Sequence, residues 1–121
     1  MKPYNEFRKG GFVSIWVGNF TSESELDDYF MRRFQADFGF QLNDRDMPEF
    51  VIKSEAVPAE DLIRGFSWAA SFEREGAQAA RRAGFDLATT MVIFYNFRYD
   101  PAGVEVSTRP PLAFVGAVPF S

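Results

Sequence analysis

The chain has 121 residues, lacks cysteine and histidine, and carries 13 basic and 17 acidic side chains for a net charge of −4. A 46% apolar fraction with 15 Phe in this length predicts one domain with a folded core and argues against disorder. Without Cys and His, disulfides, thiolate chemistry, Cys-ligated metal sites and imidazole catalysis are excluded. The acidic surplus disfavours direct binding of nucleic acid and suits a basic partner.

The N-terminal segment 1–11 contains Lys2, Arg8 and Lys9 but lacks the apolar stretch that a signal peptide requires. We interpret it as an N-terminal extension, followed by one domain over 12–121. No apolar stretch in the sequence approaches the roughly 20 residues that a membrane-spanning helix needs. We therefore expect a cytoplasmic protein that makes no contact with a membrane.

The first predicted elements are a strand and a helix. Alternating apolar residues predict a strand over 12–17, and Gly18-Asn19 ends it. Ser22 with Glu25 three residues later fits a capping box, which predicts a helix from about Glu23 to Arg33. A second short helical piece is predicted over 33–37, and the polar stretch 41–49 is predicted to be a loop.

The second half of the chain predicts a late group of strands. In chain order, the patterns predict a strand over 50–53, a helix from Pro58 to Ile63, a helix over 71–83, a strand over 89–99, a hairpin strand over 104–108 and a final strand over 112–118. This order predicts a single α+β domain. Its largely antiparallel sheet of four to five strands has about three helices packed mainly on one face.

Carboxylates gather in three stretches of the sequence, which are Glu23 to Asp28, Asp44 to Glu49 and Glu55 to Asp61. The Asp44-Arg45-Asp46 run lacks the glycine and the distal glutamate of a calcium loop, so we predict no metal site and no cofactor. Two interpretations remain open. The acidic stretches are either a solvated face or a patch that recognises a partner.

The aromatic residues of the predicted strands also leave alternatives open. Trp16 and part of the segment 95–99 would form an exposed platform if they lay on a helix-free face of the sheet. Such a platform could stack RNA bases or anchor a protein interface, or other segments of the chain could cover it. The negative net charge counts against RNA.

Two sequence blocks resemble one protein family. The stretch Val13-Ser-Ile-Trp-Val-Gly-Asn-Phe20 with Ser22-x-x-Glu25-Leu26 and Tyr29, and the stretch Val92-Ile-Phe-Tyr-Asn-Phe-Arg-Tyr99, resemble the immunity protein 22 family of bacterial polymorphic toxin systems. Landmarks at 34–39, 65–72 and 112–120 follow in the same order, so the resemblance covers about 12–120. The chain departs from the family after the first helix, where it passes quickly through Arg32 and Arg33 instead of a longer acidic stretch.

The resemblance implies a protein that is not an enzyme and that binds and neutralises a cognate toxin. Toxins of such systems are often nucleases, including HNH-like ones, and stoichiometric contact would block the active site or the substrate-binding surface. The acidic composition agrees with a basic nuclease as partner. We expect the contact residues to be Glu23, Asp27, Asp28, Asp44, Asp46 and Glu49, with Trp68 as an aromatic anchor.

Two alternatives accompany this interpretation. A small carboxylate-dependent enzyme acting on a sugar or phosphate would need carboxylates that converge in a concave pocket. An RNA-binding sheet would need the exposed aromatic platform. The chain is expected to be a monomer, or a weak homodimer formed through an edge strand such as 112–118.

Overall fold

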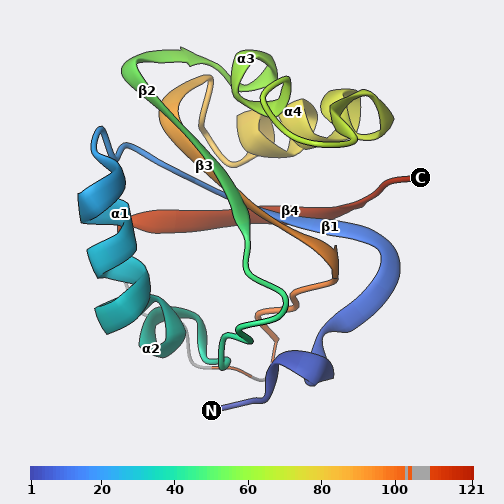
Figure 1. Cartoon of the computed structure of the whole chain (residues 1–121). Coiled ribbons are helices and arrows are strands. Elements are labelled where there is room, and N and C mark those ends of the chain that lie inside the picture. Colours follow the sequence, from blue (N-terminus) through green and yellow to red (C-terminus); the bar gives the residue numbers. More distant parts are fainter. Residues whose placement is uncertain (103, 105–109) are drawn as a thin grey trace.

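The computed structural model describes residues 1–102, 104 and 110–121. Within them, four strands form one sheet in the order β2-β3-β1-β4, and every neighbouring pair is antiparallel (Figure 1). The strands are β1 (Arg8–Gly18), β2 (Glu49–Pro58), β3 (Leu87–Phe97) and β4 (Leu112–Pro119). The α+β class and the antiparallel sheet are thus confirmed. The predicted strand over 104–108 lies outside the described residues, apart from Val104.

The helices occupy the two connections that the sequence predicts. The connection from β1 to β2 holds α1 (Glu23–Tyr29), a π-helical turn η2 (Phe30–Phe34) and α2 (Gln35–Phe38), and the connection from β2 to β3 holds α3 (Ala59–Ile63), η3 (Ala69–Ser71) and α4 (Glu73–Arg82). The predicted cap is present, because the Ser22 hydroxyl accepts a hydrogen bond from the N–H of Glu25 over 3.4 Å. Helical structure therefore continues from α1 through η2 to α2 and ends at Gly39, which has a φ of 76°.

The helices cover both faces of the sheet, rather than mainly one as the sequence predicted. On one face, Val13, Ile15 and Val17 of β1 join a core with residues of α3 and α4. On the other face, Trp16 joins residues of α1, η2 and α2. Figure 1 shows α3 and α4 above the strands and α1 and α2 beside and below them. The two central strands are apolar on both faces, so each face needs its own cover.

The second core is built mainly from aromatic rings. Trp16 is fully buried, with the rings of Phe34, Phe38 and Phe94 at 5.4 to 5.6 Å from its own. Tyr4 and Phe7, which precede β1, are buried in the same cluster. β1 itself begins at Arg8 instead of Phe12, and its register against β3 shifts between Arg8 and Val13. Gly10 and Gly11 lie within this irregular stretch. They interrupt the apolar alternation from which a strand is predicted, so the sequence pattern does not reveal the start of β1.

A buried serine links the two central strands. The Ser14 hydroxyl donates to the carbonyl oxygen of Phe97 over 2.7 Å and accepts from the N–H of Tyr99 over 2.9 Å. The end of β3 and the residues after it are therefore fixed to the middle of β1.

Candidate functional site

The first four residues of β2 form an exposed edge of the sheet. In the described part of the chain, β2 pairs only with β3, through the register Glu49 to Ile93 and Phe50 to Val92. Figure 1 shows β2 crossing in front of the other strands. An edge strand leaves one row of backbone N–H and C=O groups free for a partner.

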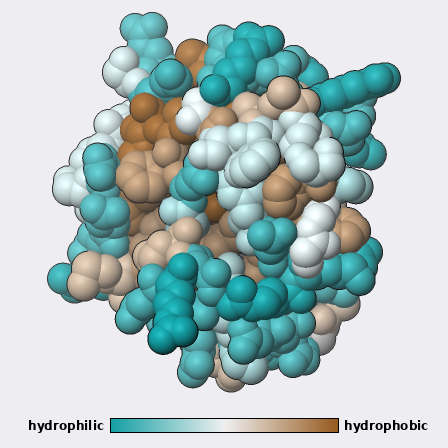
Figure 2. Space-filling model, turned by 45° about the vertical axis from the view of Figure 1, so that its right-hand side comes forward, coloured by the Kyte–Doolittle hydropathy of each residue, from teal (hydrophilic) through white to brown (hydrophobic). Residues whose placement is uncertain are grey.

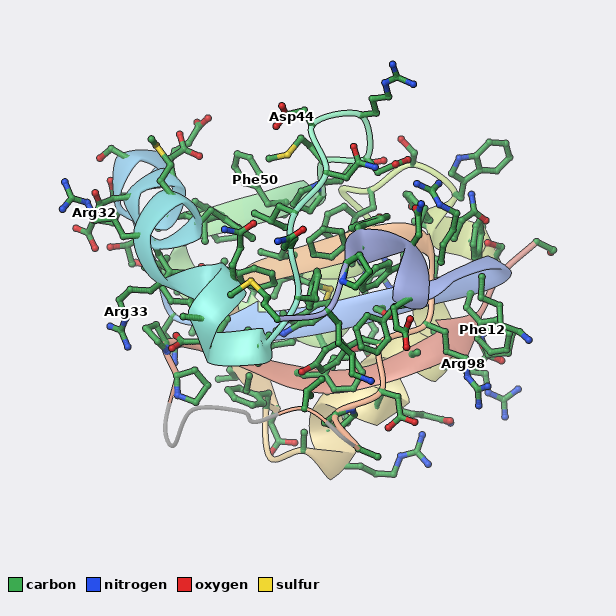
Figure 3. All side chains as sticks on the ribbon, turned by 90° about the horizontal axis from the view of Figure 1, so that it is seen from below. Phe12, Arg32, Arg33, Asp44, Phe50 and Arg98 are labelled. Atoms are coloured by element: carbon green, nitrogen blue, oxygen red, sulfur yellow. The ribbon has the colours of Figure 1, made fainter. Side chains whose placement is uncertain are left out.

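Large apolar side chains are exposed beside this edge. Phe50 is 36% exposed and Met47, three residues before it, is 56% exposed. Figure 3 shows Phe50 on the same side of the molecule as Asp44. Figure 2 shows brown apolar residues that reach the surface among teal hydrophilic ones. An exposed apolar patch with a polar rim is typical of a protein interaction site.

Trp68 is attached to the same edge by a side chain of β2. Oε1 of Glu49 accepts a hydrogen bond from the N–H of Ser67 over 3.3 Å, so the residue before Trp68 lies next to the start of β2. The Trp68 backbone is left-handed with a φ of 62°, and its carbonyl oxygen accepts from the N–H and the hydroxyl of Ser71 over 3.0 and 2.9 Å. A fixed turn thus presents an indole that is 66% exposed.

We call the residues Asp44, Met47, Glu49, Phe50 and Trp68 the β2-edge surface. Three of the residues that the sequence predicted to contact a partner, Asp44, Glu49 and Trp68, lie in or next to the start of β2. Met47 and Phe50 were missed. Phe50, Val51 and Ile52 are consecutive apolar residues, and successive side chains of a strand point to opposite faces, so the sequence does not show which of the three is left exposed.

Asp46 lies in the same loop, but its charge is already compensated. Its Oδ2 accepts from Nη2 of Arg8 over 2.6 Å and from Nδ2 of Asn43 over 3.0 Å. The ion pair raises the pKa of the Arg8 guanidinium, and the main cause is the hydrogen bond that Arg8 donates to Asp46. Asp46 therefore fixes the loop onto the start of β1 rather than presenting a free carboxylate.

The remaining predicted residues lie on α1, which is a separate surface. Glu23, Asp27 and Asp28 are all exposed there. Oδ1 of Asp28 accepts from Nε of Arg32 over 2.6 Å, and both side chains are more than half exposed. Such an exposed pair contributes little to stability. The acidic outer side of α1 is thus present as predicted, but it is not part of the β2-edge surface.

The aromatic platform predicted as one alternative does not form. Trp16, Phe97 and Tyr99 are buried, and Tyr95 packs against Phe72 and Phe120. Helices on both faces cover these rings, so they cannot stack on bases. The pKa of Tyr95 is raised, chiefly by desolvation, and its buried hydroxyl has no hydrogen-bond partner among the described residues.

The described residues also offer little support for the alternative of a carboxylate-dependent enzyme. Across 1–102, 104 and 110–121, no group of three or more Asp or Glu side chains is placed to hold a metal ion. A cavity of about 590 Å³ lies beside β1, but its acidic lining residues are Glu6 and Asp100, and Lys2 lies 3.7 Å from the carboxylate of Glu6. Carboxylates therefore do not converge in this cavity as acid–base catalysis requires.

Comparison with known proteins agrees with the resemblance in the sequence. A family model described as Immunity protein 22 matches residues 13–121, which is nearly the whole chain. No curated protein and no solved structure gives a significant match. Among the residues described, no helix has the length and apolar character needed to cross a membrane.

Proposed function

Since the chain belongs to the immunity protein 22 family, we propose that it neutralises a cognate toxin by binding it stoichiometrically through the β2-edge surface. The observation that carries the choice of surface is the exposure of Trp68, Met47 and Phe50 beside an open strand edge. Burying such side chains against a partner removes apolar area from water, which is the main favourable term in protein association.

The composition of the surface suits a tight interface. Truncation of tryptophan is among the substitutions that cost most binding energy at protein interfaces. Because the turn at Trp68 is fixed, docking would cost less conformational entropy. A standard interface covers about 800 Å² on each partner. The described residues expose 6755 Å², so such an interface would cover about an eighth of it.

We further propose that the toxin is a basic nuclease. A nuclease needs positive charge to hold the phosphate backbone of its substrate. The net charge of −4 would speed the approach of such a toxin, and Asp44 and Glu49 would lie at the rim of the contact. Bound in this way, the chain would cover the surface that the nucleic acid needs, and no catalytic step by the chain is required.

The test uses the toxin that is encoded beside this chain. The purified toxin domain is incubated with DNA and with RNA while the chain is titrated in, and cleavage of either substrate identifies a nuclease. We expect cleavage to stop when the two proteins reach equal amounts, and the complex to elute as one species. Inhibition by far less than one equivalent would contradict stoichiometric binding, and a toxin that cleaves neither substrate would contradict the nuclease assignment.

A matched pair of variants locates the surface. The double variant Phe50→Ala with Trp68→Ala should lose protection of cells that express the toxin, whereas Leu87→Ala should keep it. Leu87 is 56% exposed but pairs with Pro58 at the other end of β2. Equal protection by both variants would remove the β2-edge surface from the proposal without affecting the family assignment.

A further inference from the structure

A basic region lies at the irregular start of β1, on another side of the molecule from the β2-edge surface. Figure 3 shows Phe12 and Arg98 close together there, far from Asp44 and Phe50. The guanidinium carbon of Arg98 lies 5.0 Å from the centre of the Phe12 ring, and Nζ of Lys9 lies 6.0 Å from it. Both cations thus lie near the same aromatic ring.

Acidic side chains do not neutralise these two cations. Both side chains are exposed, and no described carboxylate lies within ion-pair distance of Lys9 or Arg98. The arrangement is unusual for a chain with more acidic than basic residues. Two like charges near one ring repel each other, and an anion that contacts both of them would relieve that repulsion.

The two cations line the cavity of about 590 Å³ beside β1, together with Lys2 and Arg8. The acidic groups in its lining are engaged locally. Glu6 lies 3.7 Å from Lys2, and Oδ1 of Asp100 accepts from the N–H of Ala102 over 2.9 Å. The lining carries four cations, Lys2, Arg8, Lys9 and Arg98, against the two carboxylates of Glu6 and Asp100, so the charge of the cavity is net positive.

The backbone that carries these residues is held on several sides. The N–H of Arg98 donates to the carbonyl oxygen of Phe7 over 2.7 Å, and the buried Ser14 hydroxyl bonds the residues before and after Arg98. On β1, the N–H of Gly11 donates to Oδ1 of Asn96 over 3.3 Å. The cavity is thus built from fixed backbone, which lowers the cost of ordering a bound ligand.

We propose that this cavity is a binding site for a phosphate group, held by Lys9 and Arg98. A phosphate near neutral pH carries about one and a half to two negative charges and so matches two cations, whereas a carboxylate matches one. Arginine also binds phosphate through two parallel N–H donors. Lys9 and Arg98 lie over the Phe12 ring, so the site recognises the phosphate group rather than a stacked base. The phosphate is free inorganic phosphate or a phosphate carried on a nucleotide.

The test uses the full chain alone and so is independent of the proposed toxin binding. Backbone amide shifts are recorded by NMR during titration with inorganic phosphate at constant ionic strength. We expect saturable shifts in 8–12 and 96–100, with affinity about tenfold weaker in Lys9→Gln and in Arg98→Gln. Lys53→Gln and Arg74→Gln, which change exposed cations outside the cavity, should bind as the unchanged chain does.

Further titrations separate the sources of the phosphate. Adenosine monophosphate that binds about as well as inorganic phosphate indicates a site for the phosphate group alone, and binding more than about tenfold tighter indicates a nucleotide. Adenosine and acetate should not saturate the site. Shifts that rise linearly with inorganic phosphate, or that stay the same in the Lys9 and Arg98 variants, would overturn the proposal.

Discussion

The carboxylate of Glu49 accepts a hydrogen bond from the backbone N–H of Ser67, which is 18 residues away in the sequence. The bond attaches the turn that presents Trp68 to the first residue of the edge strand. Trp68, in the connection from β2 to β3, therefore lies next to the start of β2. The expected effects of substitution at this surface depend on that attachment.

Replacing Trp68 with Ala is expected to weaken toxin binding without unfolding the chain. Truncation of a tryptophan at the centre of an interface costs about 2 kcal/mol or more, whereas an exposed side chain away from the core changes stability by about 0.5 kcal/mol or less. Binding is measured by calorimetry and stability by urea unfolding. Leu87→Ala is the control, and a loss of affinity as large as that of Trp68→Ala would contradict a specific role for the indole.

Reversing the charge of Asp44 is expected to slow association with a basic toxin. We expect Asp44→Lys to lower the association rate by a factor of about three or more at low salt and to make the rate less dependent on salt. Stopped-flow kinetics across a salt series measures both effects. Asp27→Lys tests the outer side of α1 in the same way. If only Asp27→Lys slows association, the contact lies on α1 and not at the β2 edge.

Ser14→Ala is expected to destabilise the fold by about 1–3 kcal/mol, because two buried polar groups would lose their partner. The carbonyl oxygen of Phe97 and the N–H of Tyr99 both bond to this hydroxyl. The free energy of unfolding in urea measures the effect. Ser54→Ala, at an exposed position of β2, should change it by less than about 0.5 kcal/mol. Equal stability of the two variants would show that water satisfies the freed groups.

Gly18→Ala is expected to cost about 1–3 kcal/mol through overpacking. A Cβ atom at this buried position would lie 2.8 Å from the backbone oxygen of Pro111 and 2.8 Å from Cδ2 of Leu112. Gly10→Ala is the matched control, because no atom lies within 4 Å of a Cβ added there. Thermal unfolding of both variants measures the difference, and a neutral Gly18→Ala would mean that β4 moves away at no cost.

Alkaline pH is expected to unfold the chain through its tyrosines. Burial raises the pKa of Tyr4 and of Tyr99 to about 12, and it also raises the pKa of Tyr29 and Tyr95. The folded-state pKa of these tyrosines lies above the unfolded value of about 10. Their contribution to the free energy of unfolding is therefore fully present below a pH of about 10 and is lost as the pH rises towards 12. Unfolding in urea at a series of pH values measures this slope. Tyr4→Phe should make the free energy of unfolding depend less steeply on pH in this range. An unchanged dependence would contradict the assignment of the pH effect to Tyr4.

Much of the fold could be predicted because its local signals agree with its tertiary structure. The alternation in β1, the long apolar stretch of β3 and the cap at Ser22 each specify an element within a few residues. The sequence gives weaker evidence that the helices are divided between the two faces of the sheet. This division follows from the apolar residues on both faces of β3, but the sequence does not show which helix covers which face.

The candidate site was only partly predictable. The exposure of Trp68 depends on a left-handed turn and on the bond from Ser67 to Glu49, and neither has a local signature. The compensation of Asp46 depends on Arg8, which is 38 residues away. Charge pairs across such separations follow from the fold rather than from composition, so a list of acidic residues overstates the free negative surface.

The chain has two tryptophans, and they lie in opposite environments. Trp16 is fully buried among aromatic rings, whereas Trp68 is 66% exposed on its turn. Their fluorescence should therefore report two different events. The emission of Trp16 should change only when the core opens, and the emission of Trp68 should shift when a partner covers it. Trp68→Phe and Trp16→Phe would give two single-tryptophan proteins, one an optical probe of unfolding and the other an optical probe of docking.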